Sequence, residues 1–204
     1  MGRILMGKQA KINHDILFTT SVFHTNFEAH KSKHNSLIAI INNTFRKKEN
    51  TFKSNRGGWQ SEIHTYNGGS FKLLIENIMQ VCDKVKSILD LHVVNPKIKY
   101  WVNINKKYDY NTSHIHPNSI LSGVYYLKVP ENSGDIVFHH PSPYMHLIEH
   151  ASVNQYNNGT YSYTPKEGDL FIFSPYLNHE VTQNLTEDED DERVSIAFNI
   201  TTTP

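Results

Sequence analysis

The chain has 204 residues, a length that suits one domain with a sizeable core. Lys and Arg together number 20, as do Asp and Glu, so the formal net charge is zero and no global field draws the protein to nucleic acid or anionic lipid. The single cysteine, Cys82, excludes an internal disulfide and is typical of a reducing compartment. No segment approaches the roughly 18 apolar residues of a membrane span, so we expect a cytoplasmic protein without a membrane partner.

The first half of the chain has the pattern of one strand and two helices. Residues 15–27 are rich in β-branched and aromatic side chains and predict an opening strand, and residues 35–45 carry apolar side chains at helical spacing. A loop with two glycine pairs, residues 54–69, follows, and Ser70 then stands where a helix N-cap is expected. Residues 71–90 keep the i, i+3, i+4 rhythm of one buried face and predict a second helix.

After Pro96 the chain reads as a series of short strands separated by Gly, Pro and Asn. The predicted strands are residues 97–105, 120–129, 134–140, 161–165, 168–174 and 193–200. Many short strands at this spacing favour a sandwich, jelly roll or barrel, with the helices packed outside one sheet. We expect one domain over residues 1–204, with a strand and supporting helices in 1–95 and a β core in 96–204.

Two histidines stand at the head of an apolar run, in the stretch NTSHIHPNSILSGVYYL. If a strand begins there, His114 and His116 project from the same face and can share a metal ion. A third ligand should come from another strand of that face, and His179 follows an apolar strand and a Ser-Pro break. Asp109 is a weaker candidate, because its surroundings read as a turn and its spacing points it to the other face.

Arg193 begins the last predicted strand, with Ser195 two residues later on the same face. An arginine that points into a core needs an anionic partner, and a carboxylate bound by both guanidinium arms satisfies it. The alternative is a surface ion pair with the acidic run 187–192. By strand alternation Tyr126, and not Tyr125, is in phase with the paired histidines.

The order of these motifs resembles the iron(II) and 2-oxoglutarate dependent oxygenases. The resemblance rests on H-x-H, SGVYYL, a GD strand, a distal histidine and RVSIAFN, and it covers about Trp101 to Asn199. The loop SNRGGWQS adds a narrower likeness to uncharacterised members that are common in phage genomes. For a phage protein, the cytoplasm would be that of the host cell.

The resemblance implies a double-stranded β-helix, the jelly-roll core of this family, with a site at its mouth. His114, His116 and His179 would hold iron(II), and 2-oxoglutarate would chelate the metal with its far carboxylate on Arg193, assisted by Ser195 and Tyr126. The reaction would consume dioxygen and 2-oxoglutarate, release succinate and CO2, and hydroxylate a primary substrate that the sequence does not identify.

One departure from the family pattern leaves two alternatives open. The family usually has Asp or Glu where this chain has His116. Three neutral imidazoles leave iron(II) with its full charge, as in three-histidine dioxygenases of the cupin type that use no 2-oxoglutarate. The other alternative is a jelly-roll binding or virion-associated protein without catalysis.

Three further features have no role that the sequence identifies. A second histidine cluster reads as a substrate-facing loop, although His146 and His150 would share a helix face and could hold zinc; its members are His139, His140, His146 and His150. The six like charges of residues 187–192 favour a solvated loop. The helical first half could supply the surface of a homodimer.

Overall fold

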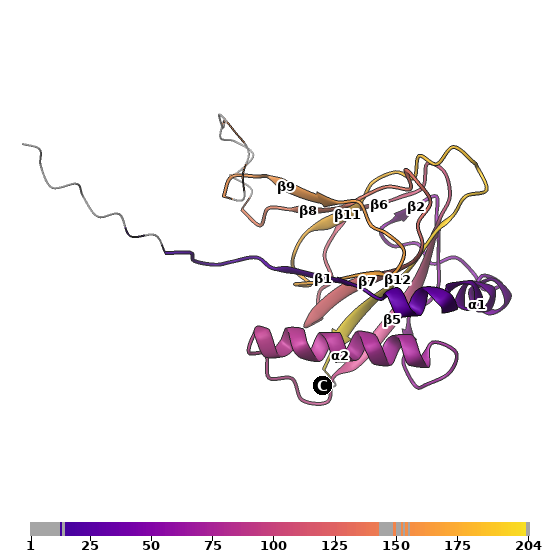
Figure 1. Ribbon diagram of the computed structural model, residues 1–204, viewed down its shortest axis with the longest axis horizontal. Helices are drawn as coiled ribbons and strands as arrows, with labels where there is room; N and C mark the ends of the chain where they lie inside the picture. The colour runs from indigo at the N-terminus through magenta and orange to yellow at the C-terminus, as the bar shows by residue number, and fades with distance from the viewer. Residues whose placement is uncertain are drawn as a thin grey trace, which may run out of the picture.

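The structure is a computed structural model that describes residues 13, 15–142, 149, 152, 154 and 156–202. Two antiparallel sheets face each other, and the helices lie against the outer side of one of them (Figure 1). The mainly β class with flanking helices is therefore confirmed. None of the helices in the described part of the chain is both long and apolar enough to cross a membrane.

The larger sheet carries the helices. Its strand order is β1-β10-β7-β12-β5-β3, and β4 pairs with β5 off this path. The bounds are β1 (Val22–Asn26), β10 (Asp169–Phe173), β7 (Leu121–Lys128), β12 (Arg193–Thr201), β5 (Lys97–Asn105), β3 (Trp59–Gln60) and β4 (His64–Thr65). Strands from the first 95 residues thus extend both edges of a sheet whose centre comes from later in the chain.

The smaller sheet has the order β2-β6-β11-β8-β9. Its strands are β2 (Asn55–Arg56), β6 (Tyr110–His114), β11 (His179–Val181), β8 (Ile136–His139) and β9 (Thr160–Tyr163). From β5 onward the chain crosses repeatedly between the two sheets, so residues distant in sequence meet in the space between them.

The predicted strand over 120–129 is confirmed as β7, but the stretch from Asn111 to Leu127 is not one continuous strand, as the phase argument for Tyr126 assumed. β6 ends at His114, and β7 begins at Leu121 in the opposite sheet. Between them Pro117 lacks a backbone donor and Asn118 takes a left-handed conformation with φ of 63°, so the chain turns. Likewise the predicted opening strand is shorter, because β1 begins only at Val22, where pairing with β10 starts.

The helices come from the first half of the chain. The 3₁₀ segment η1 (Glu28–Lys33), α1 (His34–Ile40) and the π segment η2 (Ile41–Phe45) run on from β1, and α2 (Lys72–Ile88) follows the glycine-rich loop. The predicted helix over 71–90 is confirmed apart from its ends. The prediction of Ser70 as its N-cap is wrong, because Phe71 is the N-cap and makes no side-chain capping bond. The helix begins one residue later than predicted because the chain first turns at Gly69, whose carbonyl accepts from the Lys72 N–H.

Two hydrophobic clusters hold these layers together. The larger lies between the helices and the outer face of the larger sheet, and in α2 its members include Leu74, Ile75, Ile78, Cys82 and Val85. The smaller cluster fills part of the space between the sheets and includes Phe138 and Phe173. The helices therefore support one sheet from behind and leave its inner face free to line a cavity.

Candidate active site

The three predicted metal-binding histidines meet in the space between the sheets. His114 ends β6 and lies directly opposite His179, the first residue of β11, while His116 follows in the turn. Their candidate ligand atoms all lie within 4.8 Å of one another. The Nε2 atoms of His116 and His179 are 3.2 Å apart. Two nitrogens bound about 2.1 Å from one metal at a right angle lie about 3 Å apart, so the spacing fits a shared ion.

Backbone carbonyls fix the orientation of two of these rings. Nδ1–H of His114 donates to the carbonyl of Thr112 at 2.7 Å, and Nδ1–H of His179 donates to the carbonyl of Leu177 at 2.9 Å. A proton on Nδ1 leaves the lone pair on Nε2, the atom that faces the other histidines. Metal-bound histidines in proteins have this second hydrogen bond, so the donor set fits a metal.

Burial keeps the imidazoles neutral. It lowers the pKa of His179 to about 3 and the pKa of His116 to about 4, with neighbouring histidines adding to the shift, and it also lowers the pKa of His114. The surroundings are aromatic: Phe173 lies 4.6 Å from His179 and Trp101 lies 5.7 Å from His116, measured between ring centroids. A neutral imidazole is the form that binds a metal. Because their pKa values are lowered, the three histidines stay in this neutral form at pH 7.

Arg193 lies in the same cavity, and its side chain has an unmet hydrogen-bonding group. The residue is only 1% exposed. Nη1 donates to the backbone carbonyl of Ser133, whereas Nη2 has no partner among the described residues. Burial lowers the pKa of the guanidinium, although Tyr126 and Asp109 oppose that shift. A buried, half-satisfied guanidinium is expected to receive an anion, and a carboxylate fits its remaining arm.

Ser195 and Tyr126 lie beside this arginine. Ser195 is opposite Tyr126 on β7 and opposite Asn103 on β5, so the three residues form one row across adjacent strands. All three line the cavity together with Arg193 and the histidines. Burial raises the pKa of Tyr126 to about 12, so its phenol stays protonated and can donate a hydrogen bond. Tyr125 faces the helices instead, where its hydroxyl bonds to His34 at 2.8 Å.

One wall of the cavity was not predicted from the sequence. Trp101, Asn103 and Asn105 line it from β5, and Ser54, just before β2, and Asn111 on β6 also line the cavity. The Oδ1 atom of Asn103 is buried and has no partner in the described structure. The signal that could have indicated this wall is the period of two in KIKYWVNIN, where Trp101, Asn103 and Asn105 alternate with apolar residues.

The remaining candidates lie elsewhere. Asp109 is not part of the histidine group, and its carboxylate accepts a hydrogen bond from the Lys106 backbone N–H at 2.7 Å. His139 lies 3.7 Å from Glu180, outside the cavity lining. His146 and His150 are outside the described residues, so the substrate-facing loop stays a prediction, with zinc binding as its alternative.

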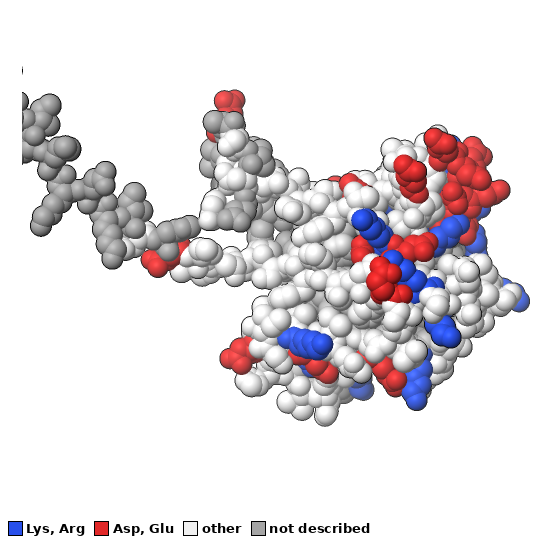
Figure 2. Space-filling view, in the orientation of Figure 1, with Lys and Arg blue, Asp and Glu red and all other residues white. Residues whose placement is uncertain are grey.

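The acidic run is exposed from Glu187 to Asp190, as predicted for a solvated loop. Figure 2 shows its carboxylates at the upper right, where the loop before β12 lies in Figure 1. Arg193 does not pair with this run: its side chain is buried and bonds to Ser133. The surface-pair alternative for Arg193 is therefore wrong.

Several solved structures share this fold. A prolyl-4-hydroxylase from Pseudomonas putida gives a TM-score of 0.64 at 14% identity, over 91% of this chain and 95% of that chain. A viral collagen prolyl hydroxylase from Paramecium Bursaria Chlorella virus-1, solved with 2-oxoglutarate, gives 0.58 at 14% identity, over 89% and 96%. HygX from Streptomyces hygroscopicus, solved with nickel and 2-oxoglutarate, gives 0.56 at 11% identity, over 91% and 84%. The predicted double-stranded β-helix is confirmed by these likenesses.

A family model described as "Putative 2OG-Fe(II) oxygenase" matches residues 99–199. The matched span runs from β5 into β12 and contains the three histidines of the cavity and its arginine. No curated protein matches the chain. The narrower likeness to phage members stays a prediction. The region over residues 99–199 therefore belongs to the iron(II) and 2-oxoglutarate dependent oxygenases, a family of oxidoreductases that uses iron(II), 2-oxoglutarate and dioxygen.

Proposed function

We propose that the protein hydroxylates an as yet unidentified substrate and converts 2-oxoglutarate to succinate and CO2. One observation carries the proposal: three neutral, converging imidazoles and one half-satisfied buried arginine line the same cavity. The first group suits a metal ion and the second suits a carboxylate. A dicarboxylic 2-oxo acid joins the two, because one end can chelate a metal while the other end pairs with the arginine.

His114, His116 and His179 would hold iron(II) through Nε2. The backbone carbonyls that accept from Nδ1 of His114 and His179 keep these rings in the required tautomer. Trp101 packs beside His116, which has no such backbone bond in the described structure, and so limits the rotation of its ring. When bound, iron(II) with 2-oxoglutarate supplies the activation of dioxygen, with one oxygen atom entering succinate and the other entering a substrate C–H bond.

The chain's own groups then bind, orient and protect. Arg193 would receive the far carboxylate on its free Nη2, and Ser195 with Tyr126 would donate hydrogen bonds nearby. Phe173 and Phe138 face His179 and exclude water from that side of the site. The primary substrate is not identified. Prolyl hydroxylases and an enzyme solved with hygromycin B share the fold of this chain, but each is only 15% identical to it or less.

Succinate formation tests this function. Anaerobic protein loaded with iron(II) and 2-oxoglutarate, then exposed to oxygen, is expected to release succinate slowly without added substrate. The iron-free protein is the control. Absence of succinate from a protein that demonstrably binds iron contradicts the proposal.

The donor set favours one second candidate, a dioxygenase that uses three histidines and no 2-oxoglutarate. No carboxylate belongs to the group of ligands found in the described residues. His116→Asp separates the two functions, because a carboxylate lowers the charge of the centre toward that of the usual family site. A gain in succinate formation supports the 2-oxoglutarate reaction, whereas no succinate from either protein, with iron bound to both, favours the second candidate.

A further inference from the structure

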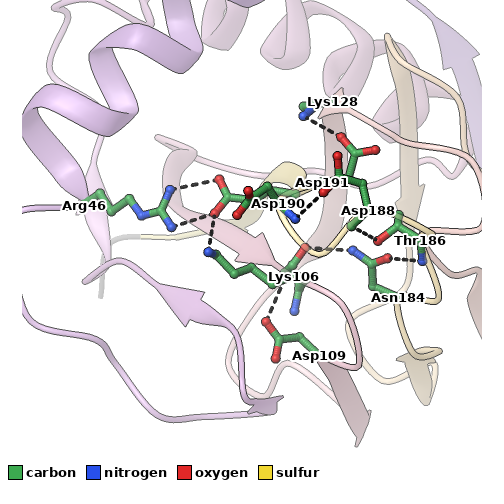
Figure 3. Close-up of polar contacts among 11 residues, drawn as sticks. Arg46, Lys106, Asp109, Lys128, Asn184, Thr186, Asp188, Asp190 and Asp191 are labelled. Carbon is green, nitrogen blue, oxygen red and sulfur yellow. Dashed lines mark hydrogen bonds and ion pairs between the residues drawn. The ribbon is translucent and has the colours of Figure 1, made fainter.

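The loop that leads into Arg193 is tied to the N-terminal helices by an ion pair. Arg46 directly follows η2, and its guanidinium donates hydrogen bonds of 2.9 and 2.6 Å to the two carboxylate oxygens of Glu192 (Figure 3). Glu192 ends the acidic run, and the next residue, Arg193, begins β12. The pair therefore joins the helical layer to the strand end that carries the cavity arginine.

This pair is better placed than the other ion pair of the loop. The Glu192 side chain is 17% exposed and the Arg46 side chain 35%, and Lys106 lies 3.8 Å from the same carboxylate. Asp191 and Lys128 also pair, but their side chains are 43% and 39% exposed. A two-pronged, partly buried pair with a second cation nearby holds its geometry better than a single exposed contact. Glu192 is thus the main anchor of the loop.

The start of β12 needs such an anchor. Arg193 pairs with Asn105 on β5, but on the β7 side the register shifts between Val194 and Ser195. The backbone at Arg193 therefore lacks a regular neighbour on that side. Its guanidinium has one hydrogen bond in the described structure, to the Ser133 carbonyl. The position of the Arg193 guanidinium therefore depends on where the preceding loop places the first residue of β12.

We propose that Arg46 is a positioning residue for 2-oxoglutarate. By holding Glu192 it fixes the first residue of β12, and so holds Arg193 where the far carboxylate binds. Arg46 does not line the cavity and acts only through the chain. The inference rests on the proposed function, which assigns that carboxylate to Arg193.

Anaerobic titration of 2-oxo acids into the iron(II)-loaded protein tests the inference through its charge-transfer absorption. Arg46→Ala is expected to raise the Kd of 2-oxoglutarate about five- to tenfold, the loss of a well-formed, partly buried ion pair. The matched probe is 2-oxopentanoate, which has the same chain length without the far carboxylate. Its Kd and that of iron(II) are expected to be unchanged, whereas general damage to the fold would weaken both.

Further variants separate the pair from its surroundings. Glu192→Ala is expected to match Arg46→Ala, and the double variant should lose no more than either single one. The exchange of Arg46→Glu with Glu192→Arg should recover part of the affinity. Lys48→Ala is the matched control, because Lys48 pairs with Glu62 at the surface and should leave both 2-oxo acids unaffected.

A Kd for 2-oxoglutarate within twofold of the parent overturns the inference, as does an equal loss for 2-oxopentanoate. If Arg46→Ala does not fold, Arg46→Lys keeps the charge without the fork and is judged by the same two ligands. Arg193→Ala distinguishes a failure of the proposed carboxylate site from a failure of the role of Arg46. Should it bind 2-oxoglutarate like the parent, the assignment of the carboxylate fails and the role of Arg46 fails with it; should it lose binding while Arg46→Ala keeps it, only the role of Arg46 fails.

Discussion

Single side chains decide whether the cavity is a metal site. His179 is 4% exposed, with Nδ1–H bonded to a backbone carbonyl and Nε2 beside that of His116. His139 lies on the neighbouring strand β8, close to Glu180 and away from the cavity lining. The two histidines therefore offer a matched comparison of a candidate ligand with a nearby non-ligand.

Anaerobic iron(II) is expected to bind at one equivalent per chain, and His179→Ala is expected to abolish binding. Removing one of three imidazoles leaves too few donors for a stable site. His139→Ala should bind iron like the parent. Isothermal calorimetry or equilibrium dialysis gives the stoichiometry, and an equal loss in both variants would refute the assignment of the ligands.

The arginine of the cavity gives a second test at this scale. Arg193→Ala is expected to weaken 2-oxoglutarate binding by about 2 to 5 kcal/mol, since it removes a desolvated partner of a carboxylate. That range corresponds to about 30-fold or more in Kd. Titration into the iron-loaded protein measures it, and Arg56→Ala, at an exposed arginine of β2, is the control. Parental affinity in Arg193→Ala would remove the residue from the cosubstrate site.

The helix α2 shows what an element contributes without touching the site. Ile78 is fully buried on its packed face, whereas Leu73 is 58% exposed on the opposite side. Ile78→Ala is expected to lower the free energy of unfolding by about 2 to 5 kcal/mol, because it leaves a cavity in a close-packed layer. Leu73→Ala should change it by less than about 0.5 kcal/mol. Urea unfolding of the iron-free protein measures both, and similar losses would contradict the assigned face.

Elements with a clear period were predictable from the sequence. The apolar rhythm of α2 and the β-branched and aromatic runs of β5, β7, β10 and β12 identify helix, strands and fold class. The turn after His114 was not predicted, because a continuous strand and a strand followed by a turn share the same apolar pattern until Pro117 is weighed. Tyr126 faces the cavity, as predicted, but the prediction assumed one continuous strand through His116 and Tyr126. In the structure His116 reaches the cavity from the turn, and Tyr126 reaches it from the opposite sheet.

Other site features depend on pairing between strands, which one sequence does not reveal. The register that places Asn103 beside Ser195 joins two distant segments, so no local pattern indicates it. The contact between Arg46 and Glu192 is of the same kind. Charge counts identified the acidic run as a solvated loop, and its anchored last residue becomes visible only once the helices are placed against the sheet.

The whole molecule should respond to pH through the buried histidines. In the unfolded chain their pKa is about 6.5. In the fold the pKa is about 3 for His179 and about 4 for His116. As the pH falls below 6.5, the unfolded state takes up protons that the native state does not. The free energy of unfolding is therefore highest above pH 6.5, as far as these histidines contribute to it, and declines toward pH 4.

Each of these histidines is expected to cost the iron-free protein about 1.4 kcal/mol of unfolding free energy per pH unit within that range. Urea unfolding at pH 7, 6 and 5 measures the slope. His116→Gln should reduce the slope by about 1.4 kcal/mol per pH unit, the contribution of one proton, because it removes one of the titrating groups. A stability that does not change from pH 7 to 5 would contradict the buried, neutral state of the cluster.

The meeting of β6 with β11 has a consequence for the chain as a polymer. His116 and His179 are 63 residues apart, and β7, β8, β9 and β10 all lie within the loop that they close. An ion held by both histidines would act as a reversible cross-link between these two distant segments of the folded protein, whose single cysteine, Cys82, is free. Because such an ion would bind the folded chain and not the unfolded one, removing it with a chelator is expected to lower the free energy of unfolding and to make the segment between the two histidines more accessible to proteases.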